Sequence, residues 1–229
     1  ERYLKLVARR LDERVPAAYL TGEAWLQGHR FFVDPRVIVP RSPISELLAD
    51  NLEPWVVDPD DIDFVLDLCT GSGCLAILAA LAFPNAQVDA VDVSEHALEV
   101  ADQNIEYFGL DGRVTVHQSD LFNNLPDCQY NLIICNPPYV NSHSMESLPA
   151  EYRHEPTNAL AGGDDGMDLV RRILKDAPQF LAPNGLLVLE IGNEFENFMT
   201  AFPGLEPVWL STANADNQIL LLTREQLAS

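Results

Sequence analysis

The stretch from Phe64 to Cys74 constrains the fold of this chain more than any other. It begins with an apolar run that is typical of a buried strand, and it passes through Gly71 and Gly73 into a pattern that predicts a helix. Two glycines at such a junction allow a tight turn and leave bare backbone beside a helix N-terminus, where a ligand can lie. This order predicts an α/β fold with its ligand at the carboxyl ends of the strands.

The rest of the chain alternates between strand and helix patterns. The expected strands are Phe64–Cys69, Gln87–Val93, Val114–Gln118, Tyr130–Cys135, Leu186–Ile191, Val208–Ser211 and Gln218–Thr223. The expected helices are Cys74–Phe83, Glu95–Phe108, Met167–Leu181 and Glu194–Phe202. The last two strands are close enough for an antiparallel hairpin, so we expect a mostly parallel sheet of these seven strands, covered by helices on both faces. Residues 140–166 are expected to be irregular, and their length indicates a functional connection.

The part of the chain before Phe64 is expected to be built differently. Glu1–Arg14 has helical spacing without a starting cap, and the first residue is not methionine, so we expect the end of a larger N-terminal helical domain. A hairpin over residues 24–33 and a helix from Ile44, capped by Ser42 and ending at Leu52, should follow. The expected parts are residues 1–16, the end of a helical domain whose remainder is absent; residues 17–63, a hairpin, a helix and a linker; and residues 64–229, the main domain.

The composition is that of an ordinary packed protein with an acidic surface. Hydrophobic residues make up 47% of the 229 residues, no window is apolar for long enough to span a membrane, and no leader opens the chain. We therefore expect a cytoplasmic protein with no membrane partner. The 14 Lys and Arg against 35 Asp and Glu give a net charge of −21, which repels phosphate backbones and favours a cationic partner. A self-repelling surface without any partner, or adaptation to salt, is the alternative.

Metal binding is not indicated by the cysteines or the histidines. The four cysteines lack Cys-x-x-Cys spacing, and the five histidines form no His-x-x-x-His pair. We expect buried free thiols in place of a disulfide framework or a zinc site, and we expect no metal cofactor.

Acidic residues lie at the ends of three expected strands, where a cofactor would bind. The glycine loop alone also fits the dinucleotide pattern Gly-x-Gly-x-x-Ala, but Asp67 beside it disfavours a pyrophosphate and favours the ammonium group of a methionine tail. Asp92 suits two ribose hydroxyls, Asp120 suits an adenine amino group, and Leu121 would cover the ring. A plain glycine turn, with Asp92 only capping the next helix, is the simpler alternative. The three carboxylates together favour S-adenosylmethionine over NAD.

The stretch Asn136-Pro137-Pro138-Tyr139 ends the fourth expected strand and offers a rigid binding shelf. The two prolines fix the backbone and remove two N–H donors. The Asn136 amide oxygen, the Pro137 carbonyl and the flat face of Tyr139 suit a planar –NH2 group, whose hydrogens they would hold while its lone pair points elsewhere. A proline turn without a function is the alternative.

These residues resemble a known family. The Asp-x-x-Thr-Gly-Ser-Gly loop, the acidic end of the second strand and Asn-Pro-Pro-Tyr are similar to the class I S-adenosylmethionine-dependent methyltransferases that modify amino nitrogens. A closer resemblance, over nearly all of the chain, is to the HemK-like protein-glutamine methyltransferases. It rests on the further segments Tyr19–Glu23, Val39–Pro43, His154–Gly166 and Leu189–Gly192. The resemblance implies a Rossmann-like class I methyltransferase fold and S-adenosylmethionine as the cofactor.

The resemblance also implies a role for each matching position. The cofactor would be bound by Asp67, Leu68, Cys69, Thr70, Gly71, Gly73, Asp92, Val93, Asp120, Leu121 and Asn136. The substrate amide would be held by Asn136, Pro137, Pro138 and Tyr139, of which Asn136, Pro137 and Tyr139 would also act in catalysis. Leu121 stands where the family often has an aromatic residue, which reduces stacking on the adenine without changing the role.

The segment Pro40-Arg41-Ser42-Pro43 bears on which branch of the family this chain resembles. The release-factor branch usually carries Pro-Arg-x-[Asp/Glu]-Thr-Glu here, whereas this segment is similar to the PrmB branch, which methylates a glutamine of the third large-subunit ribosomal protein. Ribosomal proteins are cationic, so the net charge of −21 agrees with that branch. The expected partner is a basic ribosomal protein, met before ribosome assembly, without direct nucleic-acid binding.

Other functions stay open at this point. Release-factor methylation is one alternative, and an amino methyltransferase acting on DNA or rRNA bases is another, because such enzymes share Asn-Pro-Pro-Tyr. A binding module or assembly factor would keep the fold without turnover, and an NAD-dependent reductase would need a hydride partner that nothing beside Asn136 offers. For the glutamine reaction we expect in-line transfer without a general base. Tyr139 as a base is the weaker interpretation, since a free tyrosine has a pKa of about 10.

Overall fold

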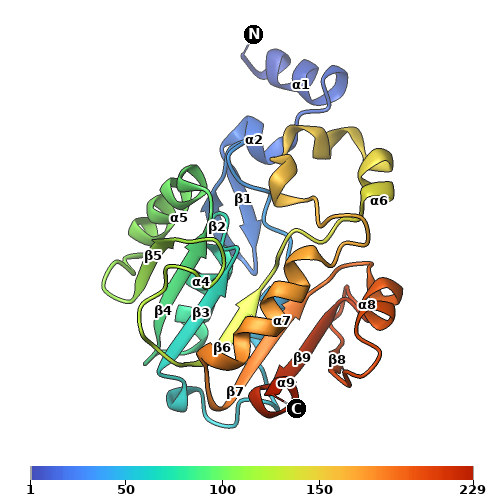
Figure 1. Cartoon of the computed structure of the whole chain (residues 1–229). Helices are drawn as coiled ribbons and strands as arrows, with labels where there is room; N and C mark the ends of the chain where they lie inside the picture. Colours follow the sequence, from blue (N-terminus) through green and yellow to red (C-terminus); the bar gives the residue numbers. More distant parts are fainter. Residues whose placement is uncertain (1, 229) are drawn as a thin grey trace.

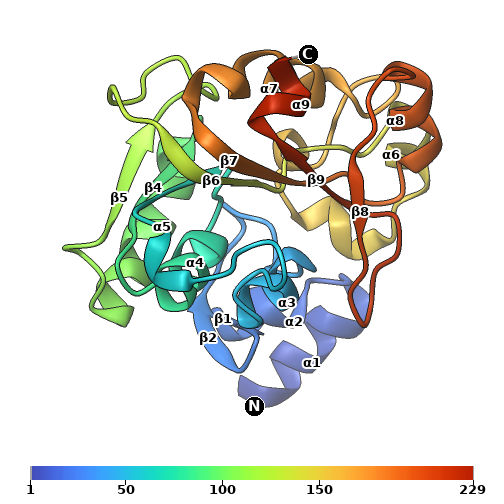
Figure 2. The same ribbon diagram turned by 90° about the horizontal axis from the view of Figure 1, so that it is seen from below.

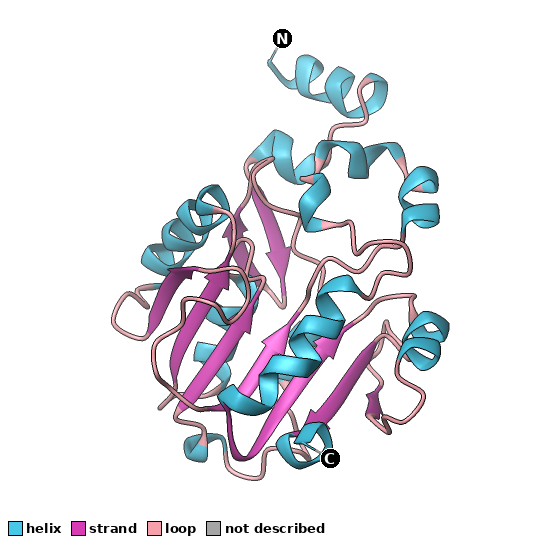
Figure 3. Ribbon diagram, viewed as in Figure 1, coloured by secondary structure: helices cyan, strands magenta, loops and turns pink. Residues whose placement is uncertain are grey.

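The computed structural model describes residues 2–228 and shows a seven-stranded sheet beside a two-stranded hairpin (Figures 1 and 3). The large sheet has the strand order β5-β4-β3-β6-β7-β9-β8. Its strands are β3 (Phe64–Leu68), β4 (Gln87–Asp92), β5 (Val114–Gln118), β6 (Tyr130–Cys135), β7 (Leu181–Glu190), β8 (Val208–Leu210) and β9 (Ile219–Thr223). β3 to β7 run parallel, whereas β9 is antiparallel to both β7 and β8. The predicted mostly parallel sheet with an antiparallel end is confirmed.

Helices cover both faces of this sheet (Figure 2). One face packs against α3 (Ile44–Ala49), α4 (Cys74–Ala82) and α5 (Glu95–Phe108), and the other against α7 (Asp168–Phe180), α8 (Phe195–Ala201) and α9 (Arg224–Ala228). Because side chains alternate along a strand, Val65 of β3 enters the first core and Leu66 the second. With both faces buried, the carboxyl edge of the sheet is left for ligands.

The N-terminal elements stand beside this edge. They are α1 (Arg2–Asp12), α2 (Ala17–Thr21), β1 (Glu23–Leu26) and β2 (His29–Phe32). The turn residues Gln27 and Gly28 have φ values of 48° and 76°, as a two-residue hairpin requires. The predicted hairpin and first helix are confirmed, although Glu1 lies outside the described residues. The division at residues 16 and 63 stays a prediction.

The expectation that residues 140–166 are irregular is wrong. They contain the short helices α6 (Ser142–Ser147), η2 (Ala150–His154) and η3 (Thr157–Ala159). The side chain of Asn141 caps α6 by accepting a hydrogen bond from the Ser144 N–H at 2.8 Å. Pro149 and Pro156 precede the other two helices, at a position where a missing N–H is tolerated. Single turns are too short to give a periodic sequence signal, which explains the error.

Two predicted element boundaries are also wrong. α3 ends at Ala49 and not at Leu52, because Asn51 and Leu52 adopt φ values of 52° and 58° that no α-helix allows. β7 begins at Leu181, five residues earlier than expected, because Leu181 pairs with Tyr130 ahead of a bulge. Within residues 2–228, no helix is long and apolar enough to cross a membrane.

Candidate active site

Two adjoining cavities lie at the carboxyl edge of the sheet. Their volumes are about 390 Å³ and about 200 Å³. The larger cavity is lined by the residues that follow β3, β4, β5 and β6, and the smaller one lies between the end of β6 and residues 144–160. Ile38, Asn136 and Ala159 line both cavities. Molecules bound in the two cavities would therefore meet at these three side chains.

The glycine loop after β3 forms part of the larger cavity. Cys69 and Gly71 line it, and both have positive φ values, 60° and 56°. The Gly71 N–H donates a hydrogen bond to Asp92 Oδ2 (3.0 Å), and the Thr70 N–H donates one to the Val91 carbonyl (2.9 Å). The loop is thereby tied to the end of β4, in the position that the sequence predicts for a cofactor loop.

Asp67 lies behind this loop and does not line the cavity. Its side chain is 0% exposed, and its Oδ2 accepts hydrogen bonds from Thr70 Oγ1 (2.5 Å) and the Ala76 N–H (3.0 Å). Its Oδ1 has no hydrogen-bond partner among the described residues, and burial raises the pKa of Asp67 to about 7. Leu68, Thr70 and Gly73 do not line the cavity either. Direct contact of these four residues with a cofactor stays a prediction.

Asp92 and Val93 line the larger cavity at the end of β4. Asp92 also accepts a hydrogen bond from the Ser94 N–H at Oδ1 (2.9 Å), and Ser94 in turn caps α5. Burial raises the pKa of Asp92, while the backbone N–H groups that it accepts from act in the opposite direction. The carboxylate therefore organises the turn before α5 and faces the cavity at the same time, so the two sequence interpretations of Asp92 are compatible.

Asp120 and Leu121 line the cavity where β5 ends. Leu121 is buried and has a φ of 53°. Asp120 is half-exposed and forms an ion pair with Arg172 of α7 at 2.8 Å. The structure thus brings Cys69, Gly71, Asp92, Val93, Asp120, Leu121 and Asn136 together around one space.

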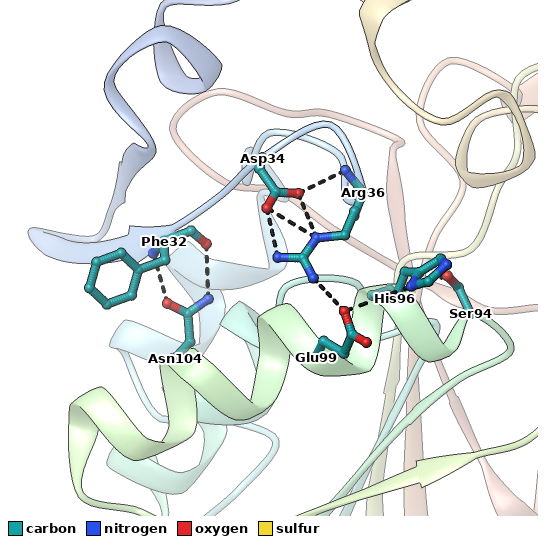
Figure 4. A network of polar contacts seen from close by, with 8 residues as sticks. Phe32, Asp34, Arg36, Ser94, His96, Glu99 and Asn104 are labelled. Carbon is teal, nitrogen blue, oxygen red and sulfur yellow. Dashed lines mark hydrogen bonds and ion pairs between the residues drawn. The ribbon is translucent and has the colours of Figure 1, made fainter.

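The outer wall of the larger cavity comes from a segment that the sequence analysis missed. Residues 35–38 leave the hairpin, cross α5, and all line the cavity. Figure 4 shows how the segment is anchored: the Arg36 guanidinium bonds to Asp34 at 2.7 Å and to Glu99 of α5 at 2.5 Å. No local pattern in the sequence marks these residues, because their role depends on a contact between segments that lie 63 positions apart.

Asn136 occupies the junction between the cavities. Its side-chain amide makes no hydrogen bond with the described residues, so both of its polar atoms are available to ligands. Pro138 faces the larger cavity, whereas Pro137 and Tyr139 face the smaller one. The four predicted substrate residues are therefore together, and they divide between the two spaces.

Tyr139 is held tightly beside the smaller cavity. A Cβ at Gly192 would come within 2.3 Å of its ring, and Cβ atoms at Gly162 and Gly166 would come within 2.7 and 2.2 Å of its backbone. The phenol donates a hydrogen bond to Glu190 Oε1 at 2.8 Å. Burial and the neighbouring Glu190 carboxylate raise the pKa of Tyr139 well above its ordinary value. At neutral pH this phenol is therefore a hydrogen-bond donor and not a base.

A second contact between distant segments encloses the smaller cavity. Arg41 forms a two-point ion pair with Glu155, with both N–O distances at 2.7 Å, and its guanidinium lies 4.7 Å from the centre of the Tyr152 ring. Arg41 and Tyr152 both line the cavity, and Glu155 is buried. The pair joins the segment after the hairpin to residues 140–166, a role that spacing alone did not predict.

Comparison with known proteins agrees with this geometry. Residues 43–152 match the methyltransferase small domain family. The ribosomal protein uL3 glutamine methyltransferase of Bordetella pertussis is 66% identical over 226 residues, which covers 99% of this chain and 76% of that protein. The protein of the same name from Burkholderia pseudomallei is 58% identical over 231 residues, which covers 98% of this chain and 75% of that protein.

A solved structure with the same fold is the hMettl16 catalytic domain in complex with MAT2A 3'UTR hairpin 6. It has a TM-score of 0.64 at 14% identity, and the match covers 97% of this chain and 79% of that one. Identity this low carries the fold alone, whereas the two bacterial proteins are 66% and 58% identical over 99% and 98% of this chain. The chain belongs to the family of ribosomal protein uL3 glutamine methyltransferases.

Proposed function

We propose that this chain transfers a methyl group from S-adenosylmethionine to the side-chain amide nitrogen of a glutamine in ribosomal protein uL3. The observation that carries the proposal is the position of Asn136, which lines both cavities with an unbonded amide. A donor in the larger cavity and a glutamine in the smaller one would meet at this residue.

The larger cavity suits S-adenosylmethionine. Its volume of about 390 Å³ lies in the range of small-molecule sites, and it combines apolar walls with a few polar groups. Asp92 would accept from the ribose hydroxyls, Asp120 from the adenine amino group, and Leu121 would cover the ring. When bound, this cofactor supplies a methyl group on a positively charged sulfur. The carboxylates that face the cavity favour such a cation over the phosphates of NAD.

The smaller cavity suits the glutamine side chain. The Asn136 amide oxygen and the Pro137 carbonyl would accept the two N–H groups of the substrate amide, and the Tyr139 ring would lie against it. A primary amide nitrogen is a weak nucleophile, so its position relative to the donor matters most. Fixing the two reactants in line supplies on the order of 7–11 kcal/mol.

The residues of this chain orient the amide and do not remove its proton. Tyr139 lines the smaller cavity, but its hydroxyl donates to Glu190 and its pKa is raised by burial. The proton on the methylated amide would therefore leave to water after transfer. This agrees with the mechanism expected from the sequence.

The charge of the chain supports a basic protein substrate. With a net charge of −21, it attracts a cationic ribosomal protein and repels RNA, so we propose that uL3 is methylated before it joins the ribosome in the cytoplasm. Release factors and nucleic-acid bases are the competing substrates.

Label transfer from tritiated S-adenosylmethionine tests the proposal. The enzyme is mixed separately with purified uL3, release factors, naked rRNA and assembled large subunits. We expect label only in free uL3, on a single glutamine identified by mass spectrometry of its peptides. Label on a release factor or on RNA, with uL3 unlabelled, would contradict the substrate assignment.

A further inference from the structure

We infer that Glu190 is a positioning residue of the methyl-transfer site, which acts through Tyr139 and whose negative charge favours the arrival of positive charge on the substrate amide. The inference rests on the proposed function, because it assigns a role in that same reaction.

Glu190 lies directly behind the binding shelf. It is the last residue of β7, and because Cys135 pairs with Leu189 in the parallel sheet, Glu190 stands beside Asn136 at the strand ends. Its side chain is only 3% exposed. Oε1 accepts the hydrogen bond from the Tyr139 hydroxyl at 2.8 Å, and Oε2 accepts one from Ser42 Oγ at 2.5 Å. One carboxylate thus joins the shelf to the start of α3.

The two hydroxyl groups of Tyr139 and Ser42 do not require a charged hydrogen-bond acceptor. A neutral carbonyl would also accept from a hydroxyl, in a weaker hydrogen bond but without the cost of removing a charge from water. No ion pair to Glu190 exists among the described residues, since the nearby Arg41 is bonded to Glu155. A buried charge that is not neutralised by a direct cation calls for a role beyond holding two hydroxyls.

The reaction provides such a role. The lone pair of the amide nitrogen forms the new bond to the methyl carbon while the carbon–sulfur bond breaks, and the electrons of that bond stay on sulfur. Positive charge therefore moves from the sulfur to the amide, and one N–H proton later leaves to water. An anion fixed behind Tyr139 lies on the amide side of the site. It therefore stabilises positive charge on the amide, as after transfer, more than positive charge on the sulfur, as before transfer.

The surroundings of Tyr139 make this link rigid. The close approach of Gly192 to the ring leaves it no room to move on that side, and the hydrogen bond to Glu190 fixes the hydroxyl end. The charge is thus held in place before the substrate arrives, which is the condition for electrostatic stabilisation without reorganisation.

Kinetics of Glu190→Gln test the inference, with uL3 labelling by the unaltered enzyme established first. The substitution keeps the shape and an acceptor oxygen for Tyr139 but removes the charge. We expect kcat to fall roughly 10- to 100-fold, while KM for uL3 and Kd for S-adenosylmethionine change less than about threefold. Unchanged kcat in Glu190→Gln, with the unaltered enzyme active, would overturn the inference and leave the proposed function intact. If the unaltered enzyme labels nothing, the proposed function itself fails.

A double-mutant cycle with Tyr139→Phe shows whether Glu190 acts through Tyr139. When Glu190→Gln is added to Tyr139→Phe, kcat should fall by less than a further threefold. Losses that multiply in the double variant would overturn the link.

The pH profile adds a readout that a merely structural role would not move. Tyr139, Arg41 and Cys135 are the titratable groups that face Glu190, and burial raises the pKa of Glu190. The acid limb of the kcat profile should therefore be absent in Glu190→Gln. The acid limb should also be absent in Tyr139→Phe, where Glu190 is still present. This variant therefore provides the same test if Glu190→Gln does not fold. An acid limb that persists in both variants would overturn the inference.

Discussion

The side-chain amide of Asn104 donates a hydrogen bond of 2.8 Å to the main-chain carbonyl of Ser72. The same side chain accepts from the Phe32 N–H (2.7 Å) and donates to the Phe32 carbonyl (3.1 Å). Asn104 is 0% exposed and belongs to α5. One buried residue therefore joins the hairpin, a sheet-covering helix and the cofactor loop, and Figure 4 shows the two bonds to Phe32.

Asn104→Ala should destabilise both the fold and the cofactor loop. It leaves the two Phe32 groups and the Ser72 carbonyl without their partner, and each such loss costs about 1–3 kcal/mol. We expect the free energy of unfolding in urea to fall by about 3 kcal/mol and the affinity for S-adenosylmethionine to fall about tenfold. The exposed neighbour Gln103 provides the control, because Gln103→Ala should change stability by less than about 0.5 kcal/mol. Equal effects of the two substitutions would contradict the anchoring role.

Asp67 should make the stability of the fold depend on pH in an unusual direction. Its pKa is raised by burial from 3.8 to about 7, so between these values the folded state binds more protons at this site than the unfolded state. Its contribution to stability is therefore greatest at low pH and is lost as the pH rises toward 7. Asp67→Asn removes this dependence.

The comparison of Asp67→Asn with the unaltered protein isolates this site from the other carboxylates. The difference in unfolding free energy, variant minus unaltered protein, should increase by about 2 kcal/mol between pH 5.5 and pH 8, as measured by urea unfolding at both pH values without cofactor. A difference that is constant with pH would show that Asp67 titrates normally.

Cys69 reports on the contents of the larger cavity. It is half-buried and lines that cavity, whereas Cys128 is also half-buried and lies outside it. S-adenosylhomocysteine should slow the alkylation of Cys69 by N-ethylmaleimide at least about fivefold, because a ligand that fills a site excludes other molecules from it. Alkylation of Cys128 should be unchanged, with both sites followed by peptide mass spectrometry. Equal protection of Cys69 and Cys128, or protection of neither, would contradict binding of the cofactor in the larger cavity.

Local sequence patterns predicted the centre of the site but not its outer walls. The glycine loop and Asn136-Pro137-Pro138-Tyr139 follow apolar strands, and strand order in an α/β sheet brings such ends together. The wall formed by residues 35–38 depends on an ion pair between Arg36 and Glu99, which no spacing rule reveals. Long-range packing of this kind is absent from a single sequence.

The chemistry of individual carboxylates was also hard to predict. From the sequence, Asp67 was expected to contact the cofactor and Glu190 was given no role, but one lies behind the loop and the other behind the shelf, both nearly without exposure. Their burial follows from the depth of the sheet at β3 and β7 and from the glycines that admit Tyr139. Those glycines carried the family resemblance, and the structure supplies the physical reason for them.

The most direct test of the account is the separate measurement of catalysis and cofactor binding in Asn136→Ala. We predict that kcat for uL3 labelling falls about 100-fold, equivalent to about 2.7 kcal/mol, because the amide nitrogen is no longer aimed at the methyl donor. The Kd for S-adenosylmethionine, measured by calorimetry, should rise less than about fivefold, since Asn136 is one of many residues that line the larger cavity. Loss of cofactor binding with turnover preserved at saturating cofactor would contradict the central claim.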